Sequence, residues 1–147
     1  MAATTHETID VDADVPTAFD YVANFGNLDE WDPAFDRAER TDTGPLGVDS
    51  TFDVRTSIGP SHVQINYRIT EFDRPRRVKL VGTAESFTSI DVIEFRARPD
   101  GGTTVAYDAE VDSSLPDWAD SMASPLFALM GKLSAAGMRD QLGDDQG

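Results

Sequence analysis

The stretch that decides the fold is residues 9–35, IDVDADVPTAFDYVANFGNLDEWDPAF. Its first part continues an alternating pattern over residues 5–12, in which Ile9 and Val11 share one face and polar residues occupy the other. Alternation of this kind is typical of a β-strand with one buried face. The chain is therefore expected to begin with a short strand.

A helix is predicted directly after this strand. Asp14 can cap the helix, and Pro16 is tolerated in a first turn because its missing N–H would have no partner there. Gly26 is expected to end the helix. The positions that recur at helical spacing and form its apolar face are Phe19, Val22 and Ala23.

A second, very short helix is predicted in NLDEWDP, residues 27–33. Asn27 can cap it, Glu30 stands three residues later as in a capping box, and Pro33 ends it. The other two acids, Asp29 and Asp32, are expected to solvate the outer face of this turn. The pattern indicates one helical turn after a kink.

From residue 34 to residue 112 the chain alternates between strand-like runs and turn-forming residues. The runs have period two and are rich in β-branched and aromatic residues. Short turns between consecutive strands indicate an antiparallel meander. The six runs are residues 34–41, 50–57, 62–72, 77–84, 87–98 and 103–111.

The last hairpin can be placed in register from its turn. Ile93 and Tyr107 must lie on the same inner face, which requires an odd number of loop residues. A three-residue loop, 99–101, meets this condition, with proline starting a type I turn and glycine in the left-handed position. This register pairs Ile93 with Tyr107 and Asp91 with Ala109, and it leaves Asp91 diagonal to Tyr107.

A long helix is predicted near the C-terminus, capped by Ser124 and ended after about Leu142 by Gly143. Gly137 is expected to let this helix approach the sheet closely. Residues 143–147 are expected to be disordered, and residues 1–147 to form one domain with its core at about 4–142. The apolar stripe of the helix comprises Leu126, Leu129, Met130, Leu133, Gly137 and Met138.

The order of these elements resembles the START-like (SRPBCC) superfamily, which includes polyketide cyclases and dehydratases and the birch-pollen-allergen fold. The segments that carry the resemblance are residues 9–35, 68–80 and 93–111 and the closing helix. The resemblance implies an α+β helix-grip fold: a seven-stranded antiparallel sheet curved around a long C-terminal helix, with two short helices between strands 1 and 2. It also implies an internal cavity that in many members holds a lipid, a polyketide or another apolar molecule.

The composition excludes several classes of function. A net charge of −15, from 27 acids against 12 lysines and arginines, argues against nucleic-acid binding, which needs a basic patch. The acids are scattered through the chain, and such a surface stays hydrated at high salt. We therefore hypothesise a halophilic source. Equal stability without salt and in molar salt would contradict it.

Other features indicate a soluble, cytoplasmic protein without a metal or cofactor. There are no cysteines, and no segment approaches the run of about 18 apolar residues that a membrane span needs. His6 and His62 are the only histidines and have no metal-binding spacing. His62 is expected to face solvent. The sequence does not distinguish a monomer from a homodimer.

Asp91 and Tyr107 are the candidate catalytic residues. Asp91 continues the inner face of Ile93, and burial raises the pKa of a carboxyl toward values useful for general acid or base catalysis. Tyr107 could donate to that carboxylate or to a ligand carbonyl. Alternatively, Asp91 lies at a strand end in contact with water, and Tyr107 is a core aromatic with a solvated hydroxyl.

A second set of bulky side chains is expected near the mouth of the cavity. Apolar walls with few polar groups are typical of small-molecule pockets. For each residue taken alone, ordinary core packing is the more frequent role. The set, with Trp31 as a lid and Phe35 as the first inward residue of its strand, is Trp31, Phe35, Phe52, Phe87, Trp118, Phe127 and Met130.

Three functions are compatible with this sequence. The first is a carrier or sensor that binds a hydrophobic small molecule, lipid-like or polyketide-like, in the internal cavity. The second is a polyketide cyclase or dehydratase that uses Asp91 and Tyr107 for aldol-type ring closure or dehydration. The third is a protein-interaction or co-chaperone-like module that docks through the sheet or through residues 27–33.

Overall fold

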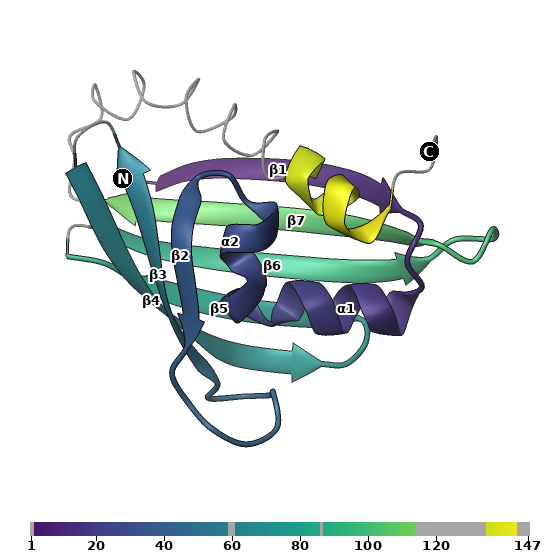
Figure 1. Cartoon of the computed structure of the whole chain (residues 1–147), viewed down its shortest axis with the longest axis horizontal. Coiled ribbons are helices and arrows are strands. Elements are labelled where there is room, and N and C mark those ends of the chain that lie inside the picture. The colour runs from purple at the N-terminus through teal and green to yellow at the C-terminus, as the bar shows by residue number, and fades with distance from the viewer. Residues whose placement is uncertain (1, 59–60, 86, 114–134, 144–147) are drawn as a thin grey trace.

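The computed structural model describes residues 2–58, 61–85, 87–113 and 135–143 (Figure 1). Two helices and a 3-10 turn (η1) follow the first strand, and six more strands follow them. Residues 135–142 form the described part of the C-terminal helix. The elements are β1 (Ala2–Val11), α1 (Val15–Ala23), η1 (Phe25–Asn27), α2 (Leu28–Trp31), β2 (Phe35–Arg40), β3 (Thr51–Ile58), β4 (Ser61–Asp73), β5 (Arg77–Thr83), β6 (Phe87–Ala97) and β7 (Thr103–Ser113).

The seven strands form one antiparallel sheet in the order β1-β7-β6-β5-β4-β3-β2. Strands β2 to β7 form the predicted meander, and β1 joins its far end by pairing with β7. Figure 1 shows α1, α2 and the C-terminal helix on the same face of the curved sheet. We call this the inner face. The α+β helix-grip architecture predicted from the sequence is confirmed.

The β6–β7 hairpin has the predicted register. Ile93 pairs with Tyr107 and Asp91 with Ala109. The turn is closed by the Gly101 N–H, which donates to the Arg98 carbonyl at 3.0 Å, and Gly101 has a φ of 93°. Only glycine adopts this left-handed conformation without a steric cost, so the turn fixes which side chains of both strands point inward.

The start of α1 follows the sequence prediction, whereas the start of α2 does not. The Asp14 carboxylate accepts the Thr17 N–H at 3.0 Å and caps α1. Asn27 precedes α2 without capping it, because its side chain donates to the Tyr21 carbonyl at 3.1 Å. Glu30 accepts the Tyr21 hydroxyl instead of reaching back to Asn27. The predicted capping box is therefore wrong: contacts with α1 take up both side chains.

The end of the C-terminal helix is fixed at two places. Gly143 ends the helix with a φ of 95°, as predicted, and its carbonyl accepts the Asp12 N–H at 3.2 Å. At Gly137, an added Cβ would lie 1.7 Å from the Trp31 carbonyl oxygen. The close approach predicted for Gly137 is therefore made to the backbone of α2 and not to the sheet. The predicted start at Ser124 lies outside the described residues.

The core lies between the inner face and the helices. Phe19 of α1 makes edge-to-face contacts with Phe72 and Phe95, with ring centroids 5.3 and 5.1 Å apart. Aromatic pairs in this arrangement add about 0.5–1.5 kcal/mol beyond the burial of their area. This end of the inner face is apolar and closely packed. In the described part of the chain, no helix is long and apolar enough to cross a membrane.

Candidate functional site

A buried carboxylate lies on the inner face of β6. The inward residues of this strand are Ser89, Asp91, Ile93 and Phe95, and each is at most 5% exposed. Asp91 is 3% exposed, so the sequence alternative that placed it in contact with water is wrong. The strand therefore changes from polar to apolar along one face within four residues.

Two hydroxyl groups donate to Asp91. The Ser89 hydroxyl donates to one carboxylate oxygen at 2.7 Å, and the Tyr107 hydroxyl donates to the other in a short hydrogen bond. The diagonal contact between Asp91 and Tyr107 expected from the hairpin register is therefore present. Sequence reasoning missed Ser89, although its place two residues before Asp91 put it on the same face.

Burial raises the pKa of Asp91 to about 6, and the charge of Asp32 adds to this effect. The hydrogen bonds from Tyr107 and Ser89 oppose it, because they stabilise the charged form. Burial and the charge of Asp91 raise the pKa of Tyr107 well above its usual value, so this phenol keeps its proton. The pair thus combines a carboxyl that titrates near neutrality with a permanent hydroxyl donor.

Tyr67 brings a third hydroxyl to the cluster, and Gly82 makes this possible. A Cβ at Gly82 would lie 2.6 Å from Cε1 of the Tyr67 ring, so the ring crosses β5 where a side chain is missing. Side-chain hydrogen bonding of Tyr67 with Asp91 lowers the pKa of that carboxyl. Sequence reasoning did not single out Tyr67, because its strand alone does not show the gap at Gly82.

Asp32 lies in the interior, contrary to the expectation that it solvates the outer face of the turn. It is 6% exposed, and its carboxylate accepts the Ala34 N–H at 3.0 Å. Its charge also raises the pKa values of Tyr67 and Tyr107. Two carboxylates therefore share the electrostatic environment of this site.

Trp31 is a predicted ligand-site residue that contacts this cluster through Tyr107. It is 1% exposed, and its ring centroid is 6.2 Å from that of Tyr107 and 6.4 Å from that of Phe25. Phe25, which the sequence did not single out, also contacts Phe52 and Tyr67 at 6.3 and 4.9 Å. Trp31 and Phe52 thus belong to one aromatic wall that ends at the carboxylate.

Two of the other predicted wall residues lie at strand starts. Phe35 and Phe87 are the first residues of β2 and β6, and both are partly buried at the margin of the core. Trp118, Phe127 and Met130 lie outside the described residues.

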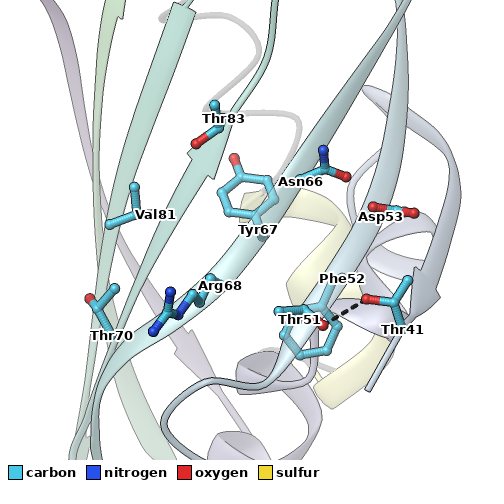
Figure 2. Close-up of a pocket in the computed structure, with 10 residues that line it drawn as sticks. All are labelled: Thr41, Thr51, Phe52, Asp53, Asn66, Tyr67, Arg68, Thr70, Val81 and Thr83. Atoms are coloured by element: carbon cyan, nitrogen blue, oxygen red, sulfur yellow. Dashed lines mark hydrogen bonds between the residues drawn. The ribbon is translucent and has the colours of Figure 1, made fainter.

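A hollow of about 530 Å³ lies over β3, β4 and β5 (Figure 2). Most of its lining residues are the members of these strands that alternate away from the inner face. Phe52 is the predicted site residue that it includes. The lining comprises Thr41, Thr51, Phe52, Asp53, Asn66, Tyr67, Arg68, Thr70, Val81 and Thr83.

The histidines lie away from the cluster. His62 is exposed on β4, as predicted. His6 of β1 pairs with Asp108 of β7, and both side chains are about half exposed. Among residues 2–58, 61–85, 87–113 and 135–143, no three histidine or carboxylate side chains gather closely enough to hold a metal ion.

The fold resembles that of several solved proteins. The Zhui aromatase/cyclase from Streptomyces sp. R1128 matches with a TM-score of 0.80 and 11% identity, over 97% of this chain and 94% of that one. A START superfamily protein from Mycobacterium smegmatis matches with a TM-score of 0.73 and 13% identity, over 95% and 96%. Ara h 8.0201 matches with a TM-score of 0.63 and 14% identity, over 95% and 99%.

These identities establish a shared fold and leave the activity open. No curated protein matches the sequence. A family model described as "Polyketide cyclase / dehydrase and lipid transport" matches residues 2–143. Since the match covers nearly the whole chain, this protein belongs to the polyketide cyclase / dehydrase and lipid transport family.

Proposed function

We propose that the protein binds a hydrophobic small molecule against the inner face, with a polar group of that molecule at Asp91. The observation that carries the proposal is a 3% exposed carboxylate at the end of an aromatic wall. An apolar wall with few convergent polar groups is typical of small-molecule sites. Membership of a family described by lipid transport supports the same function.

The energetics of Asp91 support a ligand role over a structural one. A buried carboxylate costs free energy even when it is hydrogen-bonded, and an apolar side chain of similar volume is often as stable or more stable. Ser89, Tyr107 and Tyr67 occupy part of its capacity, because a carboxylate offers about four acceptor sites. Asp91 can therefore accept a further hydrogen bond from a ligand hydroxyl.

The proposal is tested by calorimetric titration with two naphthalenes that differ in one hydroxyl, 6-ethyl-2-naphthol and 2-ethylnaphthalene. A hydrogen bond to a charged group contributes about 1.5–3 kcal/mol, so Asp91→Asn is expected to weaken the naphthol at least tenfold and to leave the hydrocarbon unchanged. Phe19→Leu, at the apolar end of the inner face, is the matched control and should affect both probes equally. Absence of saturable binding, together with no co-purified molecule in native mass spectrometry, would contradict the proposal.

A second function, dehydration or aldol-type cyclisation, is favoured by one observation: burial raises the pKa of Asp91 to about 6. A general base is most effective when its pKa lies near the working pH. In a dehydration, the Asp91 carboxylate takes a proton from the carbon next to a ketone. The protonated carboxyl then releases the Tyr107 hydroxyl, which turns to donate to the enolate oxygen. The β-hydroxyl then leaves as water with the proton that Asp91 returns, and a carbon–carbon double bond forms.

This second function is tested with 4-hydroxy-4-(2-naphthyl)butan-2-one, whose dehydration to the enone is followed by ultraviolet absorbance. The rate is expected to rise with pH through an apparent pKa of about 6, since the carboxylate is the active form. Asp91→Asn should abolish turnover and preserve binding of 2-ethylnaphthalene. Equal loss of turnover and hydrocarbon binding would refute the catalytic role.

A further inference from the structure

One buried donor in the site has no acceptor. Trp31 is 1% exposed, and its indole Nε1 lacks a hydrogen-bond partner within the described part of the chain. The neighbouring buried polar side chains differ in this respect: Ser89 donates to Asp91, and Asp32 accepts the Ala34 N–H. Within the described part of this site, the Trp31 N–H thus differs from the polar side chains around it.

An unpaired buried N–H is costly. Leaving such a donor without an acceptor costs about 1–3 kcal/mol, and phenylalanine would contribute most of the same apolar contact without that cost. Packing against Phe25 and Tyr107 accounts for an aromatic ring at position 31. This packing does not explain why the ring at position 31 carries an N–H group.

The backbone that carries this ring is held in place. The C-terminal helix lies directly against the Trp31 carbonyl at Gly137, where an added Cβ would be 1.7 Å from the oxygen. Four residues later, the Gln141 side chain donates to the Glu30 carbonyl at 3.1 Å. Such support keeps a donor preorganised, which reduces the entropy that a ligand would lose on binding.

The donors next to Trp31 are already engaged. The Tyr107 hydroxyl donates to Asp91, and so does the Ser89 hydroxyl. A ligand can therefore donate to the Asp91 carboxylate, whereas an acceptor on the ligand needs a donor from elsewhere. Trp31 meets that need beside the same tyrosine ring.

We infer that the Trp31 indole N–H binds a hydrogen-bond acceptor of the ligand, such as a carbonyl or ether oxygen. This inference rests on the proposed function and specifies its ligand: an apolar molecule that carries a donor for Asp91 and, separately, an acceptor for Trp31. Trp31 then selects for ligands that carry such an acceptor over hydrocarbons of the same shape.

The test pairs two more probes, 2-acetylnaphthalene and 2-ethylnaphthalene, which differ in a carbonyl oxygen. Titrations use the full-length protein and Trp31→Phe, which keeps the ring and removes the N–H. We expect the wild type to prefer the ketone by about tenfold, and Trp31→Phe to lose this preference with little change for the hydrocarbon. Phe19→Leu controls for general loosening of the core and should keep the preference.

A second measurement does not depend on the folding of the Trp31 variant. In Trp118→Phe, the remaining indole N–H signal in a proton–nitrogen NMR spectrum belongs to Trp31. It should move downfield on addition of 2-acetylnaphthalene and stay in place with 2-ethylnaphthalene. Binding of both probes with equal affinity, or an indole signal that the ketone does not move, would overturn the inference and leave the proposed function intact. Failure of every probe to bind would instead refute the proposed function.

Discussion

The two ends of the inner face use the same strands with opposite chemistry. The apolar half is built from Phe19, Phe72, Phe95 and Val105, and the polar half from Trp31, Tyr67, Ser89, Asp91 and Tyr107. β6 supplies Phe95 to the first and Asp91 to the second, only four residues apart. The difference shows that the side chains that stabilise the fold and those that carry the polar site occupy separate ends of one strand. Burial in the apolar half offsets the cost of a charge in the polar half.

The largest effect is expected from breaking the apolar half. Phe19→Ala removes a fully buried ring that contacts Phe72 and Phe95, and should lower the free energy of unfolding by about 3–5 kcal/mol. Urea denaturation followed by circular dichroism measures this loss. The folded fraction should still bind 6-ethyl-2-naphthol with wild-type affinity. A selective loss of naphthol binding would show that the halves are not separable.

Removing the charge of Asp91 in the polar half should increase the free energy of unfolding, whereas Phe19→Ala decreases it. The pKa of Asp91 rises from 3.8 to about 6 in the folded protein, so the folded state holds this proton more tightly than the unfolded state. The wild type therefore loses stability as pH increases from 3.8 to about 6, by about 3 kcal/mol on account of this group.

Asp91→Asn removes that dependence. The stability of the variant relative to the wild type should improve by up to about 3 kcal/mol between pH 4 and pH 7, measured by urea denaturation at each pH. All other acids are the same in both proteins, so the comparison isolates the contribution of position 91. A stability difference that does not change with pH would show that folding does not raise the pKa of Asp91.

A methyl group at Gly82 tests the polar half without replacing any of its side chains. The Cβ of Gly82→Ala would lie 2.6 Å from the Tyr67 ring, and overpacking of this kind costs about 1–3 kcal/mol. The displaced ring should also withdraw its hydroxyl from Asp91 and raise the pKa of that carboxyl above 6. Gly47→Ala, where no atom lies within 4 Å of the added Cβ, is the control and should leave both properties unchanged.

The smallest effects are expected from single hydroxyls. Tyr107→Phe and Tyr67→Phe should both raise the pKa of Asp91, because each hydroxyl stabilises the carboxylate. The increase should be larger for Tyr107→Phe, since its hydrogen bond has the stronger effect. Carbon-detected NMR titration of the aspartate carboxyls measures both shifts. The reverse order would make Tyr67 the principal donor.

Local turn chemistry predicted more of this molecule than side-chain type did. The odd-length loop at residues 99–101 determined the pairing of Ile93 with Tyr107, and with it the contact between Asp91 and Tyr107. That inference worked because alternation propagates a single turn along both strands. The contact between the two candidate catalytic residues was thus predicted from one hairpin.

The rest of the site depended on contacts between segments far apart in the sequence. Glu30 completes no capping box because the Tyr21 hydroxyl binds it, and Tyr67 reaches Asp91 only because Gly82 lies between them. Asp32 has the spacing of a solvated turn residue, yet it is buried. No single segment carries this information, since each case depends on which neighbour the fold supplies.

The contact between Gly137 and Trp31 has a consequence for how the protein can be observed. It joins the last described helix to the residue that we place against the ligand, and the same helix is tied to Asp12 through Gly143. Displacing the helix would move the indole into a different environment. The fluorescence of Trp31, measured in Trp118→Phe, should therefore change when the helix separates from Trp31. This change should precede unfolding of the sheet and needs no added dye.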